Sequence, residues 1–263
     1  MTAPLWVREL ATAFWDAAGG AEPFPRSLRG PIIRTALDLT IKEMDGLTAQ
    51  RVSDYLSGFG GGLAPAEPDR PLRGCLVAWR GAGFIFLDAA DPPDERRFSL
   101  AHELAHFLRD YLGPRGKAER VLGPAVRAVF DGVRQPSPAE RLHALLRNVP
   151  LGCHVHLMAR DEGSRPPEVE VAERDADRLA FELLAPAAEV LGRGASGADA
   201  AQLAARLGTD FALPAGPACE YAALLRPAPP PVDALLAQFR QSAESCRTLA
   251  GPRGTARGEQ TDG

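Results

Sequence analysis

Two histidines and a glutamate stand in the spacing His102-Glu103-x-x-His106. On an α-helix, residues four apart lie on one face, so both imidazoles can bind one metal ion. Glu103 is adjacent to the first histidine and can accept a proton from a water at that ion. The pattern therefore predicts a zinc site, one ion per chain, with Glu103 as the catalytic base. The alternative is a pair of hydrogen-bonded core histidines beside an ion-paired glutamate.

A catalytic zinc needs a third protein ligand and one open position. The downstream candidates are Asp110, Glu119, His143, His154, His156, Glu173 and Asp177. Asp110 lies one turn past His106, and three ligands from successive turns of one straight helix rarely converge. Glu173 is preferred because it shares a small-residue packing face of a predicted helix, where a carboxylate needs a partner. Asp177, one turn further on, is expected to accept the free N–H of a ligand histidine. The alternative for this face is a buried salt bridge.

The developing oxyanion of an acyl-transfer reaction needs a hydrogen-bond donor. His154 and His156 lie on one side of a predicted strand at 153–158 and are candidates for this role or for substrate contact, and Tyr111 is a weaker one. The favoured alternative is that both histidines lie on a solvent-facing side of the strand.

The elements that position these residues follow from the local pattern. A helix over about 94–112 is apolar nearly all round, which is typical of a central buried helix. It is expected to end at Gly113-Pro114. A β-hairpin is predicted before it, with strands at 75–80 and 84–88 around a glycine-containing turn. The helix that carries Glu173 is predicted over 169–185.

Further helices are predicted along the rest of the chain. Their ranges are 5–18, 32–44, 48–57, 117–130, 137–148, 199–208, 214–225 and one in the tail at 232–249. The pair at 32–44 and 48–57 has the spacing of a helix-turn-helix, but its acidic residues favour a helical cap. The fold class is therefore α+β: a mostly helical, zincin-like core with a small antiparallel sheet and a C-terminal helical subdomain.

Composition shifts divide the chain into four expected regions. They are an N-terminal helical region at 1–73, a core at 74–190 with an insertion at about 114–168, a helix-turn-helix-like subdomain at 191–226, and a Pro-rich, partly disordered tail at 227–263. The net charge of −4 gives no broad attraction to nucleic acid, so direct nucleic-acid binding is not expected. Four scattered cysteines and the lack of a long apolar run predict a cytoplasmic protein with no membrane partner.

The two motif helices together resemble those of the ImmA/IrrE family of bacterial zinc metallopeptidases. The resemblance rests on Arg97-Phe-Ser-Leu-Ala-His-Glu-Leu-Ala-His-Phe-Leu108 and on Glu173-x-x-Ala-Asp-x-x-Ala-Phe-x-Leu-Leu-x-Pro186, and it covers about 74–225. It implies that His102, His106 and Glu173 are metal ligands and that Glu103 is the catalytic residue. Three departures are Ser99 in place of threonine, a permuted Leu179-Ala180-Phe181, and the long gap between the motifs.

The resemblance also implies a function. Many family members cut a helix-turn-helix repressor in stress or mobile-element control, so a zinc-dependent metallo-endopeptidase with such a protein substrate is expected. The main alternative is a regulator that binds DNA or a repressor through its C-terminal helices without cutting it. The segment 214–225 has no Arg or Lys, which disfavours DNA binding. A hydrolase acting on something other than a protein is a third alternative.

Overall fold

A computed structural model describes residues 3–59, 69–147, 152–160, 166–192 and 199–226. Its elements are, in chain order, α1 (Leu5–Ala17), α2 (Arg29–Arg34), β1 (Leu39–Met44), α3 (Ala49–Ser57), β2 (Leu72–Trp79), β3 (Ala82–Asp88), α4 (Pro93–His106), the π-helix η1 (Phe107–Leu112), α5 (Gly113–Leu122), the 3-10 helix η2 (Pro124–Val126), α6 (Arg127–Phe130), α7 (Pro138–Arg147), β4 (His154–Ala159), α8 (Pro167–Leu184), α9 (Ala187–Gly192), α10 (Ala200–Phe211) and α11 (Ala215–Leu225). The predicted α+β class is confirmed. The tail at 227–263, with its predicted helix at 232–249, lies outside the described residues.

The four strands form one sheet in the order β1-β3-β2-β4. The predicted hairpin is present, and β2 and β3 pair antiparallel around a turn at Arg80-Gly81, where both residues have positive φ. β4 pairs antiparallel with the other edge of β2. β1 runs parallel to β3, so the sheet is mixed rather than purely antiparallel.

The helix predicted over 32–44 is wrong in its second half. Only Arg29–Arg34 is helical there, and Leu39–Met44 is the edge strand β1. The strand forms because β3 offers it a continuous parallel partner, from Leu39 opposite Gly83 to Met44 opposite Asp88. Because Leu39–Met44 is a strand, residues 32–57 do not form a helix-turn-helix.

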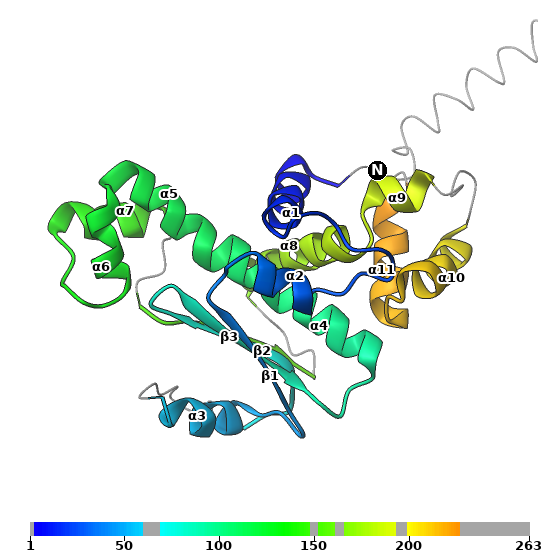
Figure 1. Ribbon diagram of the computed structural model, residues 1–263, viewed down its shortest axis with the longest axis horizontal. Coiled ribbons are helices and arrows are strands. Elements are labelled where there is room, and N and C mark those ends of the chain that lie inside the picture. Colours follow the sequence, from blue (N-terminus) through cyan, green and yellow to red (C-terminus); the bar gives the residue numbers. More distant parts are fainter. Residues whose placement is uncertain (1–2, 60–68, 148–151, 161–165, 193–198, 227–263) are drawn as a thin grey trace, which may run out of the picture. The chain divides into compact units, whose positions relative to one another are not determined.

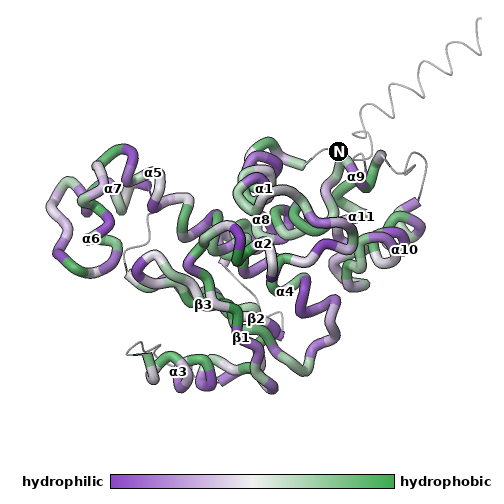
Figure 2. The backbone as a smooth tube through the Cα atoms, viewed as in Figure 1, coloured by the Kyte–Doolittle hydropathy of each residue, from purple (hydrophilic) through white to green (hydrophobic). Residues whose placement is uncertain are grey.

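The two faces of the sheet are covered by different helices (Figure 1). α4 packs on one face, where Leu76, Ile85 and Leu87 join the main core, and α3 packs on the other, against Cys75 and Phe86. Figure 2 shows the hydrophobic residues running along β2 and β3 between these helices. Both faces are buried, so the central strands are apolar on both sides. The arrangement fixes α4 on the sheet.

The motif helix does not end at Gly113-Pro114, as the sequence predicted. It continues as η1 and then as α5 to Leu122. Proline lacks an N–H and clashes with the carbonyl four residues earlier, and a π-helical stretch before Pro114 widens the turn at that place. The helix predicted over 117–130 is interrupted at Gly123, where φ is positive.

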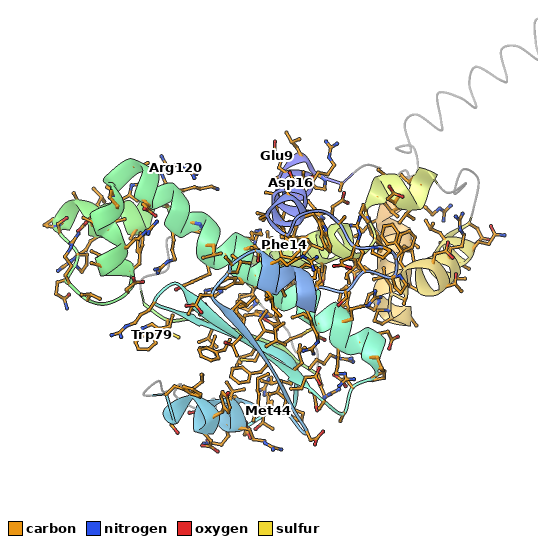
Figure 3. The ribbon with its side chains drawn as sticks, viewed as in Figure 1. Glu9, Phe14, Asp16, Met44, Trp79 and Arg120 are labelled. Carbon is orange, nitrogen blue, oxygen red and sulfur yellow. The ribbon has the colours of Figure 1, made fainter. Side chains whose placement is uncertain are left out.

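Helices from both ends of the chain complete the main core around α8. α1 turns Phe14 inward, whereas Glu9 and Asp16 are exposed on its other side (Figure 3). From the C-terminal side, Tyr221 of α11 stacks on Phe181 of α8, with ring centroids 4.4 Å apart. Met1–Leu225 thus forms one compact unit.

Two further observations concern the predicted regions. β4, which belongs to the sheet, lies within the range 114–168 that was expected to be an insertion. Among the described residues, none of the helices has the length and apolarity needed to cross a membrane.

Candidate metal centre

α4 carries His102, Glu103 and His106 on the buried surface between the sheet and α8. Their exposed fractions are 2 %, 0 % and 2 %. The Nε2 atoms of the two histidines are 3.1 Å apart, as expected for side chains one helical turn apart. Three ionisable groups at such depth need partners, and these come from other elements.

α8 and β4 each bring one donor to the same place. Glu173 of α8 lies with Oε2 3.6 Å from His102 Nε2 and Oε1 3.8 Å from His106 Nε2. His156 of β4 places Nε2 2.7 Å from Glu173 Oε1. One atom from each of these four residues lies within 4.8 Å of the other three. Segments about 70 positions apart in the chain therefore meet at one point.

Two carboxylates fix the orientation of the α4 histidines. Asp177 Oδ1 lies 2.8 Å from His102 Nδ1, and Asp110 Oδ2 lies 2.7 Å from His106 Nδ1. A carboxylate at Nδ1 holds the proton there and leaves the Nε2 lone pair for a metal. This function of Asp110 was missed from the sequence, where it was weighed only as a ligand. Its position four residues after His106 was the available signal.

The donor set fits a zinc ion. Imidazole nitrogen and carboxylate oxygen are ordinary zinc ligands, whereas Ca²⁺ and Mg²⁺ prefer oxygen alone. His102 and His106 are buried, and the carboxylates behind the imidazoles are those that usually support a metal-bound histidine. The residues present can therefore hold a single divalent ion.

The histidines and carboxylates of the cluster change one another's pKa values. Burial lowers the pKa of His102, but the hydrogen bond to Asp177 and the nearby Glu173 carboxylate outweigh this and raise it to about 10. Burial also opposes a charge on His156, yet the contact with Glu103 raises its pKa to about 9. Burial and the two neighbouring imidazoles lower the pKa of His106. The carboxylates around the three imidazoles thus favour a positive charge in this cluster.

Glu103 is held at the edge of this cluster. Its Oε2 accepts a hydrogen bond from His156 Nδ1 at 2.9 Å. Its Oε1 is buried and has no hydrogen-bond partner among the described residues. The backbone of β2 approaches closely at Gly74, where an added Cβ would lie 3.1 Å from Oε1. The carboxylate is therefore confined, with one oxygen free to accept a proton.

The structure leaves two predicted residues outside the donor cluster. The Tyr111 hydroxyl accepts a hydrogen bond from the Gly81 N–H at 2.8 Å, at the hairpin turn. His154 lies beside Tyr111, with ring centroids 6.1 Å apart, and its Nε2 is buried without a partner in the described part of the chain. His156, which the sequence placed with these two, instead joins the donors.

A cleft of about 670 Å³ opens beside His102 and Glu173. Arg73, Met158 and Arg160 line it from the sheet side, and the start of α11 closes another side with Pro217 and Glu220. A cleft of this size beside the four clustered donors can admit a stretch of a larger substrate.

The segment that contains the hairpin and the motif helix is similar to a known peptidase family. Residues 73–121 match the Peptidase_M78 family model, described as the IrrE N-terminal-like domain. This match confirms the resemblance to the ImmA/IrrE family. The M78 peptidases are metallopeptidases, in agreement with the His/Glu cluster. His156 and Glu173 lie beyond the matched residues. Neither a curated protein nor a solved structure matches the chain.

Proposed function

We propose that the protein is a zinc-dependent metallo-endopeptidase. The observation that carries this proposal is the convergence of His102, His106 and Glu173 on one buried point, with Glu103 alongside. The match of residues 73–121 to a peptidase family supports it.

In this proposal, His102, His106 and Glu173 hold one zinc ion, and Asp177 and Asp110 fix the two imidazoles behind it. A bound zinc supplies Lewis-acid activation of water and of the scissile carbonyl. Glu103 accepts the proton of the attacking water at its unpaired oxygen and returns it to the leaving amine. His154, whose Nε2 is without a partner in the described part of the chain, is the candidate donor to the oxyanion.

The substrate in this proposal is a protein segment in an extended conformation. β4 is an edge strand that pairs only with β2 among the described residues, so its outer edge can accept an added strand. The cleft beside His102 and Glu173 adjoins this strand through Met158 and Ala159. A helix-turn-helix repressor is the substrate that the family resemblance suggests, in stress or mobile-element regulation.

The test is cleavage of a repressor encoded next to this gene. The zinc-loaded protein is incubated with the repressor and the products are identified by mass spectrometry. The Glu103→Gln variant should keep its zinc and lose at least about 100-fold in rate, because it retains the shape but not the base. Glu168→Gln, in the exposed first turn of α8, is the matched control and should cut normally. Undiminished cleavage by Glu103→Gln would contradict the assignment.

A gel shift with the DNA upstream of the repressor gene examines the alternative of a regulator that does not cut. Binding of this DNA without cleavage would favour that alternative. α11 offers no Arg or Lys for phosphate contacts, so no shift is expected.

A further inference from the structure

Three imidazoles in the centre have the same arrangement. His102 and His106 each place Nδ1 against a carboxylate, Asp177 and Asp110, and direct Nε2 toward Glu173. His156 repeats this: its Nδ1 lies 2.9 Å from Glu103 Oε2, and its Nε2 lies 2.7 Å from Glu173 Oε1. A carboxylate at Nδ1 with Nε2 toward a shared point is the usual arrangement of a metal-bound histidine.

The rings are also close enough for one ion. The ring centroids of His156 and His106 are 3.7 Å apart, and those of His156 and His102 are 5.3 Å apart. The backbone under His156 is fixed, because His156 lies opposite Leu76 in the antiparallel pairing of β4 with β2. Only 12 % of the His156 side chain is exposed, so water does not compete freely for its Nε2.

We propose that His156 is a fourth protein ligand of the metal, so that the resting centre is a closed site of three histidines and Glu173. This inference rests on the proposed function and adds to it. A catalytic zinc normally keeps one position open for water or substrate. Here His156 holds that position, and the same ring holds Glu103 through its Nδ1. Release of His156 frees the coordination position and the second oxygen of Glu103 together.

The pattern of contacts distinguishes His156 from its neighbour on the strand. His154 lies two residues earlier on the same side of β4, yet it is not among the four clustered donors. His154→Ala is therefore a matched control for the loss of an imidazole from this strand. His156→Phe, which keeps an aromatic ring of similar bulk but has no donor atom, accompanies His156→Ala in case the smaller side chain disturbs the strand.

The experiment measures the metal rather than the reaction. Zinc affinity is determined by competition with a chromophoric chelator, and the visible spectrum of the Co²⁺-loaded protein is recorded with and without thiocyanate. We expect both His156 variants to bind zinc more weakly, by more than about 100-fold, because a direct ligand should exceed the 10- to 100-fold effect of an outer contact. The zinc affinity of His154→Ala should match that of the wild type; its activity is not a control, because His154 is the candidate oxyanion donor.

Thiocyanate reports the open position directly. It should leave the Co²⁺ spectrum of the wild type unchanged and alter that of both His156 variants. Wild-type zinc affinity in these variants, or a thiocyanate response in the wild type, would overturn the inference and leave His156 as a positioning residue for Glu103. The proposed function fails separately, if His102→Ala and Glu173→Ala retain wild-type zinc affinity.

Discussion

The Glu103 side chain lies against the backbone of Gly74, where there is no room for a side chain. A Cβ on Gly74 would lie 3.1 Å from Glu103 Oε1 and 3.2 Å from its Cγ. These distances are shorter than ordinary van der Waals contacts, and the buried carboxylate has little room to move. Gly74 thus sets the place of the base from the adjacent strand.

Gly74→Ala should therefore impair catalysis more than metal binding. We expect a loss of about 10- to 100-fold in kcat, since small displacements of a catalytic group have effects of this size. Zinc affinity should stay within a few-fold of the wild type because the ligands are not touched. Gly116→Ala, at an open position of α5, is the matched control and should leave both quantities unchanged. Equal activity of Gly74→Ala and wild type would mean that Glu103 is not confined by β2.

Spacing along the chain indicated five of the residues that the structure brings together. They are His102, Glu103, His106, Glu173 and Asp177. His102, Glu103 and His106 follow from a helical period within one element, and Glu173 and Asp177 were preferred as carboxylates on a packing face of their helix. His156 could not be placed in the same way, because its position depends on β4 pairing with β2, and a strand pattern alone does not say which face meets α4. The role of Asp110 also depended on geometry, namely on which nitrogen of His106 it contacts.

At the scale of the elements, Asp88 joins the ends of three strands. Asp88 is the last residue of β3. Its Oδ1 accepts hydrogen bonds from the N–H groups of Gly46 and Ala90, both at 3.0 Å. Its Oδ2 pairs with Arg160, just after β4, at 2.8 Å. Gly46 follows β1. Burial alone would raise the pKa of Asp88, but the Arg160 contact and the two backbone hydrogen bonds outweigh it and lower the pKa below 3.8.

Asp88→Asn should destabilise the fold in a pH-dependent manner. At pH 7 we expect a loss of about 2–3 kcal/mol, which is typical of hydrogen bonds to a buried charged group. Because the folded-state pKa lies below the unfolded one, this stabilisation is complete well above pH 3.8 and is lost as the pH falls through the folded-state pKa. Urea unfolding of both proteins from pH 7 to pH 3 measures it. Asp16→Asn, exposed on α1, should have little effect. A pH-independent difference would contradict the role of the charge.

Helices and strands could be predicted where a local sequence pattern determines them, but not where pairing with a distant segment determines them. The hairpin, α8 and the helical pair α10 and α11 follow from turn residues, periodicity and capping. The strand β1 does not, because its parallel pairing with β3 is set by residues about 44 positions away. The continuation of the motif helix past Pro114 was also not predicted, because a π-helical turn has no simple sequence signal.

At the scale of the molecule, the centre connects three elements that are otherwise joined by long stretches of chain. α4, β4 and α8 each contribute at least one donor. These donors also contact one another by ion pairs and hydrogen bonds. A metal ion held by these donors would bind the folded state alone, since the unfolded chain does not bring the donors together.

Zinc should therefore raise the melting temperature of the whole unit. At free zinc about 1,000-fold above Kd, the folded state gains about 4 kcal/mol. For a chain of this size that corresponds to a shift of about 8–16 °C. Differential scanning calorimetry with zinc, and again after a chelator, measures the shift. Mg²⁺ should give none, because it prefers an octahedral set of oxygens. Glu173→Ala removes the donor that faces all three imidazoles and should abolish the response. A zinc-dependent shift that persists in Glu173→Ala would place the ion elsewhere in the chain.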